Sequence, residues 1–219
     1  MFLPLALFAP KLHWRRNIGR YITRLWLCLC GIRVQINGLA TLPESGCVVV
    51  ANHCSYIDGP LLAAVLPPRF SLVIKNEAGK VPVVSFFLRH FDHLLVERHK
   101  PKKAAQDAQR IIDRLHSGGS IGIFAEGTFH ATPGVQRFKP SAFIGACRHQ
   151  IPVVPAAIKG TRHFLPEGRK TIRLVTIEVT LLPSIMPTVN NELSERQLAR
   201  QTAEQARHAI ANTVQEPLL

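Results

Sequence analysis

The chain has 219 residues and 47% hydrophobic content, which suits one domain with a sizeable core and excludes a disordered chain. Lys and Arg number 27 against 14 Asp and Glu, a net charge of +13 that attracts nucleic acid, an anionic membrane surface or phosphorylated small molecules alike. No run reaches about 18 uncharged apolar residues, so no ordinary transmembrane helix is predicted. The five cysteines form no Cys-x-x-Cys pair, so we expect reduced thiols and no metal site.

Residues 13–30 carry the clearest amphipathic pattern. The apolar residues follow one helical stripe: Trp14, Ile18, Tyr21, Ile22, Leu25, Trp26 and Leu29. Arg16, Arg20 and Arg24 fall on the opposite side. Tryptophans on one face and arginines on the other are typical of a helix in the headgroup layer of a membrane. The alternative is a helix that packs its apolar face on the domain and extends its arginines into solvent.

After this helix, apolar strand patterns and helical patterns alternate. Strands are predicted at 47–51, 70–74, 94–97, 120–125, 151–158 and 172–182. Helices are predicted at 60–66, 81–90, 102–116, 140–149 and 195–213. This alternation predicts a single α/β domain whose mixed, mostly parallel sheet carries helices on both faces.

The turn after the first predicted strand holds His53 and, five residues later, Asp58. A neutral imidazole can take a proton from a hydroxyl, and a carboxylate on its other ring nitrogen fixes the tautomer. On a regular helix the two side chains would point about 140° apart, so they meet only if the backbone between them is irregular. The alternative is that Asp58 caps the helix that begins at Gly59-Pro60.

Polar residues also follow the other predicted strands. They are Lys75 and Glu77, Glu97-Arg98, Glu126-Gly127-Thr128, and Lys159-Gly160-Thr161. In a parallel sheet these positions meet at the carboxyl edge, where such folds bind ligands. The set predicts a site for a phosphorylated hydroxyl compound. Lys75 and Arg98 would hold the phosphate, Glu126 would accept from a hydroxyl, and the Gly127 backbone would approach the ligand.

Four sequence blocks in this order resemble those of the glycerolipid acyltransferases, the family of 1-acylglycerol-3-phosphate acyltransferases. They span about residues 33–162 and are Asn52-His53-x4-Asp58, Lys75-x-Glu77 with Pro82 and Val96-Glu97-Arg98, Phe124-Ala125-Glu126-Gly127-Thr128, and Ile151-Pro152-Val153-Val154-Pro155 continuing to Gly160-Thr161. The resemblance implies transfer of a fatty acyl chain to the free hydroxyl of a lysophospholipid, without metal or other cofactor. Acyl-CoA or acyl-carrier protein would be the donor and co-substrate.

By matching position, the resemblance makes His53 the general base and Asp58 its orienting partner. Lys75 and Arg98 would contact the acceptor phosphate, and Glu126, Gly127 and Thr128 would help to fix the acceptor. Residues 1–36 would be a membrane-associated segment and 37–219 the acyltransferase domain. The protein would lie on the cytoplasmic face of a membrane, the inner membrane if it is bacterial.

The third block departs from the family pattern. Ala125 replaces a proline, and Phe129 and His130 replace an arginine and a serine. The acceptor is therefore either 1-acylglycerol-3-phosphate, our first candidate, or another lysolipid such as a lyso-ornithine lipid. A basic nucleic-acid-binding domain and a catalytically silent lipid-binding relative are the alternatives from other classes.

Overall fold

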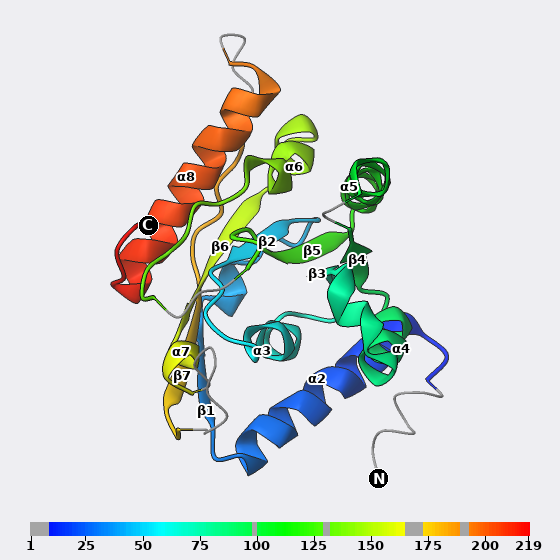
Figure 1. Cartoon of the computed structure of the whole chain (residues 1–219), viewed down its shortest axis with the longest axis vertical. Coiled ribbons are helices and arrows are strands. Elements are labelled where there is room, and N and C mark those ends of the chain that lie inside the picture. Colours follow the sequence, from blue (N-terminus) through cyan, green and yellow to red (C-terminus); the bar gives the residue numbers. More distant parts are fainter. Residues whose placement is uncertain (1–8, 98–99, 129–131, 165–172, 189–192) are drawn as a thin grey trace.

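A computed structural model describes residues 9–97, 100–128, 132–164, 173–188 and 193–219 (Figure 1). These residues form a seven-stranded sheet in the order β1-β7-β6-β2-β5-β3-β4. The strands are β1 (Arg33–Asn37), β2 (Val48–Ala51), β3 (Phe70–Lys75), β4 (Leu94–Val96), β5 (Ser120–Phe124), β6 (Val153–Lys159) and β7 (Thr176–Leu181). The order is not sequential, because the connection from β2 to β3 leaves room for β5 between these two strands.

Five adjacent strands, β6, β2, β5, β3 and β4, run parallel to one another. Strand β7 pairs antiparallel with β6, and β1 pairs parallel with β7 at the edge. The residues that follow the five parallel strands therefore lie along one edge of the sheet, as the sequence predicts. That edge carries the candidate site.

Helices cover both faces of the sheet, and alternate residues of β2 point into the two resulting cores. Val48 and Val50 pack with one cluster, while Val49 and Ala51 pack with the other. The first core includes α5 (Pro101–His116), α6 (Ile144–Arg148) and α8 (Glu195–Val214). The second includes α2 (Leu12–Leu29), α3 (Asp58–Val65) and α7 (Thr161–Phe164). Helix α4 (Pro82–His90) and the 3-10 turns η1 (Leu39–Thr41), η2 (Asn76–Lys80) and η3 (Pro140–Ala142) complete the elements.

The predicted single α/β domain with a mostly parallel sheet is confirmed. Strand β1 was not predicted, because its side chains alternate between exposed and half-buried and form no apolar run. It crosses the predicted boundary between 36 and 37, and Leu27 and Ile32 are buried in the core. Residues 27–36 thus contribute to the core and the sheet, and the membrane association of residues 1–36 stays a prediction.

Helix α2 is oriented with its arginine side toward the domain. Arg16 is buried and donates to Phe91 O at 2.7 Å, Pro68 O at 3.1 Å and Ser71 Oγ at 2.6 Å. Arg20 and Arg24 donate to the carbonyls of Val65 and Ala64 at the end of α3. This direction follows from the unpaired carbonyls that a helix C-terminus presents.

The tryptophan side of α2 faces outward. Trp14, Tyr21, Leu25, Trp26 and Leu29 are between 46% and 78% exposed. The alternative in which α2 packs this stripe on the domain is therefore wrong. Within the described residues no helix is both long enough and apolar enough to cross a bilayer.

Replacing Arg16 with alanine should lower the free energy of unfolding by about 3 kcal/mol, because Phe91 O, Pro68 O and Ser71 Oγ lose the hydrogen bonds from this buried guanidinium. The matched control is Arg110→Ala on α5, whose ion pair with Asp107 involves an exposed guanidinium and should cost less than about 1 kcal/mol. Chemical denaturation measures both changes. Equal losses in the two variants would contradict this account of how α2 is attached.

Candidate active site

The side chains of His53 and Asp58 meet at the carboxyl end of β2. Nδ1 of His53 lies 2.9 Å from Oδ2 of Asp58, which is fully buried, while His53 retains 14% exposure. Residues 52–57 form an irregular turn, and α3 begins only at Asp58. As the sequence indicated, His53 and Asp58 can meet because no regular helix separates them.

The same carboxylate oxygen holds the backbone of the turn. Oδ2 of Asp58 accepts the N–H of Cys54 at 2.6 Å and of Ser55 at 2.8 Å. Because this oxygen already accepts two donors, it is an acceptor toward the ring as well, so Nδ1 of His53 carries the proton. Nε2 is then the ring nitrogen that can take up a proton. Asp58 makes no capping bond to α3, whose N-cap is Ile57, so the alternative capping role is wrong.

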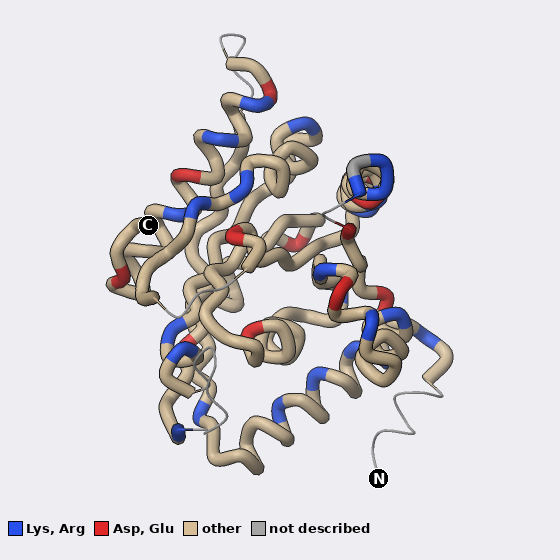
Figure 2. Tube along the Cα trace, viewed as in Figure 1, with Lys and Arg blue, Asp and Glu red and all other residues tan. Residues whose placement is uncertain are grey.

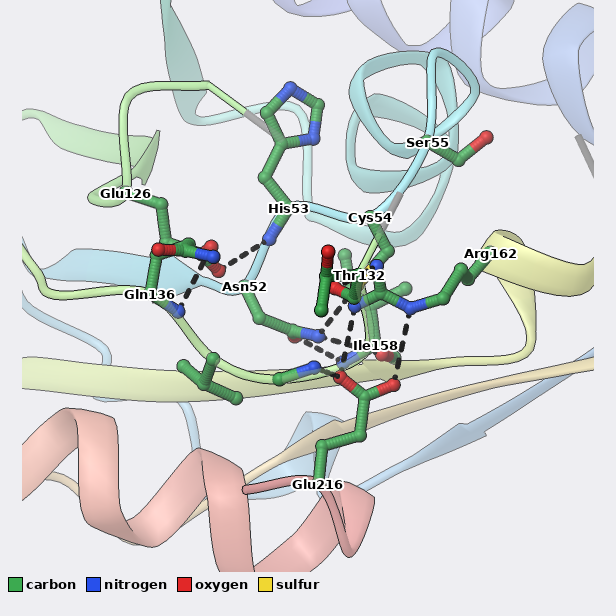
Figure 3. A network of polar contacts seen from close by, with 12 residues as sticks. Asn52, His53, Cys54, Ser55, Glu126, Thr132, Gln136, Ile158, Arg162 and Glu216 are labelled. Atoms are coloured by element: carbon green, nitrogen blue, oxygen red, sulfur yellow. Dashed lines mark hydrogen bonds and ion pairs between the residues drawn. The ribbon is translucent and has the colours of Figure 1, made fainter. Parts of the chain in front are cut away.

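The imidazole of His53 stacks on the ring of Phe124, the last residue of β5. The ring centroids are 4.3 Å apart and the planes are inclined by 21°. Figure 3 shows the ring on one side of the His53 backbone and the Glu126 carboxylate on the other. The ring plane is thus fixed by Asp58 at one nitrogen and by Phe124 across one face.

Glu126 joins the turn after β2 to the segment after β5. Its Oε1 accepts the N–H of His53 at 2.9 Å, and its Oε2 accepts the N–H of Gln136 at 3.2 Å (Figure 3). The side chain is 7% exposed. Burial raises its pKa to about 7, against the lowering effect of these two backbone donors. Both carboxylate oxygens thus have protein partners, and contact with a substrate hydroxyl stays a prediction.

Asn52 anchors the turn to β6 on the other side. Its Oδ1 accepts the N–H of Ile158 at 2.8 Å, and its Nδ2 donates to Ile158 O at 2.9 Å. The side chain therefore pairs with the strand backbone as another strand residue would. Nδ2 also lies 3.3 Å from the sulfur of Cys54. The residue before the histidine is structural in this arrangement.

Arg162 on α7 joins three segments behind His53. It donates to Thr132 O at 2.9 Å and to Glu216 Oε2 at 2.9 Å, and its Nη2 lies 3.4 Å from Cys54 Sγ (Figure 3). Neither Arg162 nor Glu216 was predicted as a site residue. Arg162 follows the Gly160-Thr161 turn, which was a weak signal, but its partner lies 54 residues away and has no local signal.

The remaining predicted site residues that the structure describes lie along the same edge of the sheet. Lys75 ends β3, which is separated from β2 by β5, so it lies two strands from His53, roughly 10 Å along the sheet edge. Gly127 has φ of +87°, a conformation that favours glycine. Thr128 is exposed. Arg98 lies outside the described residues.

The pKa of Glu126 leads to a pH-dependent prediction. The folded protein holds this proton up to about pH 7, whereas the ordinary value is 4.5, so the unfolded chain releases it first. The contribution of this group to stability is complete below the ordinary pKa and is lost as pH rises to about 7. The parent should therefore lose this contribution between about pH 5 and about pH 8, whereas Glu126→Gln has no carboxyl group to titrate. Over this range the unfolding free energy of the variant should rise on the order of 2 kcal/mol relative to that of the parent.

Denaturant titrations of parent and variant across this pH range measure the difference. The matched control is Glu44→Gln, the same change at an exposed position before β2. A constant difference between the Glu126 variant and the parent at every pH would contradict the assignment.

Comparison of the sequence with known proteins identifies its family. A sequence model of the Acyltransferase family matches residues 33–159. A chloroplastic 1-acyl-sn-glycerol-3-phosphate acyltransferase of Brassica napus is 28% identical over 73% of this chain and 48% of its own length. A lyso-ornithine lipid O-acyltransferase of Brucella abortus is 29% identical over 94% of this chain and 81% of its own length. The chain spans 47% to 66% of the plant and algal relatives it matches.

A solved structure has the same fold. The crystal structure of a 1-acyl-sn-glycerophosphate acyltransferase from Thermotoga maritima aligns with a TM-score of 0.79 at 22% identity, over 97% of this chain and 86% of that one. The family match covers more than half of the chain and includes both His53 and Asp58. The chain belongs to the Acyltransferase family.

Proposed function

We propose that the protein transfers a fatty acyl chain from acyl-CoA or acyl-carrier protein to the free hydroxyl of a lysophospholipid, with 1-acylglycerol-3-phosphate as the first candidate acceptor. The observation that carries the proposal is the 2.9 Å contact between His53 Nδ1 and Asp58 Oδ2. It leaves Nε2 as the nitrogen that receives the hydroxyl proton at an edge where this fold binds ligands.

In the proposed reaction, Nε2 of His53 takes the proton as the acceptor oxygen attacks the thioester carbonyl. The imidazolium that forms lies against Asp58, whose negative charge stabilises it. Collapse of the tetrahedral intermediate breaks the carbon–sulfur bond, and the imidazolium returns the proton to the departing thiolate. The products are the acylated lipid and the free thiol of the donor, and no cofactor is consumed.

Direct transfer is favoured over an acyl-enzyme intermediate on Cys54. This thiol lies beside His53 in sequence, but it is 5% exposed and its sulfur contacts Asn52 and Arg162. Burial raises its pKa to about 12, so almost none of it is thiolate near neutral pH. A neutral, enclosed thiol is a poor nucleophile.

Two observations bear on the acceptor. Lys75 supplies a cation at the sheet edge, which supports a phosphate-bearing lipid. The relative that acts on lyso-ornithine lipid, by its name, aligns with 94% of this chain and 81% of its own length, more complete coverage than the Brassica napus relative gives. An acceptor without this phosphate is therefore the second candidate.

The orientation of α2 supports a membrane-surface enzyme. Both tryptophans face outward, while Arg16, Arg20 and Arg24 bond to main-chain carbonyls of the domain. A helix that leaves its aromatic side exposed is suited to the headgroup layer. The same contacts occupy three of the cations that a nucleic-acid-binding surface would need. We place the protein on the cytoplasmic face of a membrane, where acyl-CoA and acyl-carrier protein are made.

Replacing His53 with alanine should lower kcat by roughly 10²- to 10⁴-fold, because the general base is lost. Asp58→Asn should also lower kcat, since the imidazolium loses its charge partner. Transfer of a labelled acyl chain to 1-acylglycerol-3-phosphate measures both effects. The control is His208→Ala, an exposed histidine on α8, with folding checked by circular dichroism. Full activity in a folded His53→Ala protein would end the proposal.

A panel of lysolipids incubated with labelled acyl-CoA identifies the acceptor. We expect 1-acylglycerol-3-phosphate to gain the label fastest, and Lys75→Ala to lower its kcat/KM by roughly 10- to 100-fold. Lys102→Ala, an exposed lysine on α5, is the control. Faster labelling of lyso-ornithine lipid, with no effect of Lys75→Ala, would establish the second candidate. Labelling of no acceptor by either acyl-CoA or acyl-carrier protein would refute the reaction.

A further inference from the structure

Helix α4 exposes apolar side chains in its first turns. Val83 is 66% exposed, Phe86 52%, and Val81, the N-cap residue, 53%. Val84 adds a further 40% exposed side chain. Val83 and Phe86 are three residues apart and therefore share one face of the helix. No residue of α4 is buried, which is unusual for a helix of this apolarity.

Both sides of α4 carry apolar residues: Phe87 and Leu88 are half-buried, whereas Val83 and Phe86 are exposed. Ser85 lies toward η2, since a Cβ added to Gly79 would come within 3.8 Å of Ser85 Oγ. Like α2, whose tryptophans face outward, α4 leaves large apolar side chains exposed. Packing among the described residues therefore leaves apolar surface uncovered on both helices.

The two helices are in direct contact. Arg16 Nε on α2 donates to Phe91 O, at the end of α4, at 2.7 Å. Gly19 on α2 packs against the Phe91 ring, which a Cβ at this position would approach to 3.0 Å. Figure 1 shows α4 beside the first half of α2. The exposed face of α4 therefore belongs to a helix that lies next to α2, whose outward side we assign to the membrane.

Cations stand at both ends of the apolar face. Lys80 is exposed directly before α4, and Arg89 is exposed in its last turn. Figure 2 shows Lys and Arg on α2 as well as around α4. Apolar side chains bordered by cations suit an anionic lipid surface, where the side chains enter the acyl boundary and the cations meet the phosphates. We propose that residues 81–86 insert into an anionic bilayer as a second membrane contact beside α2.

This inference rests on the membrane-surface part of the proposed function and adds a consequence for the substrate. Turn η2 (Asn76–Lys80) directly joins α4 to Lys75, the residue expected to hold the acceptor phosphate. Insertion of residues 81–86 would bring Lys75 toward the level of the lipid phosphates. The acceptor would then reach the site along the membrane rather than through solvent.

Vesicle sedimentation with the full chain tests the contact. A variant with Val83→Ser and Phe86→Ser should bind phosphatidylglycerol vesicles about tenfold more weakly than the parent. The matched control is Met186→Ser, which removes a side chain of equal exposure, 52%, from the segment after β7. Binding of the double variant equal to that of the parent would overturn the proposal.

A second measurement retains the apolar surface and reports insertion directly. In a Trp14→Phe, Trp26→Phe background, tryptophan is placed at Phe86 or, as the control, at Met186. Lipids brominated in their acyl chains should quench the Phe86→Trp fluorescence and leave the Met186→Trp fluorescence unchanged. Equal quenching at both positions, or none at Phe86→Trp when vesicles are bound, would contradict insertion.

Two further readouts separate this inference from its alternatives. Acyl transfer to a short-chain, water-soluble lysolipid should be unchanged in the double variant, whereas transfer within vesicles should fall with binding. If the double variant loses vesicle binding but still acylates the soluble lysolipid, the result supports insertion of residues 81–86. If the parent protein transfers no acyl chain in either assay, only the proposed function is refuted. If the lipid-free parent self-associates and the double variant is monomeric, the face is an interface between copies and the proposal is wrong.

Discussion

One oxygen atom of a buried carboxylate determines the conformation of the candidate site. Oδ2 of Asp58 lies within 2.9 Å of the His53 ring nitrogen and of the N–H groups of Cys54 and Ser55. The turn cannot open without leaving this buried oxygen unpaired, which would cost a substantial part of the stability of a domain. The proton acceptor is thereby held in one tautomer and one orientation before any substrate arrives.

Hydrogen bonds also join the turn to the two strands on either side of β2. Asn52 pairs with the backbone of β6, and Glu126, two residues after β5, accepts the N–H of His53. Arg162 and its ion pair with Glu216 close the arrangement from behind. Polar networks of this kind make a buried region rigid, because a rearrangement would leave several donors and acceptors without a partner. The histidine side of the site is therefore rigid, whereas α2 and α4 leave apolar side chains exposed.

Sequence patterns predicted the sheet and the edge of the site because both depend on local features. Apolar runs mark buried parallel strands, and the residues that end them meet at one edge wherever the strands lie. Strand β1 was missed because an edge strand with exposed side chains has no such run. The direction in which α2 packs was left open, because periodicity separates two faces of a helix and does not say which one the domain covers. Glu126 illustrates a further limit, since backbone N–H groups that occupy its carboxylate leave no pattern in the sequence.

The central claim is that Asp58 holds His53 with its proton on Nδ1 and thus makes Nε2 the base. Nitrogen-15 NMR of the His53 imidazole tests this most directly. Near neutral pH the neutral ring should show a protonated Nδ1 and an unprotonated Nε2, and the Nδ1 proton should show the downfield shift of a strong hydrogen bond to a carboxylate. A neutral ring with its proton on Nε2 would contradict the account.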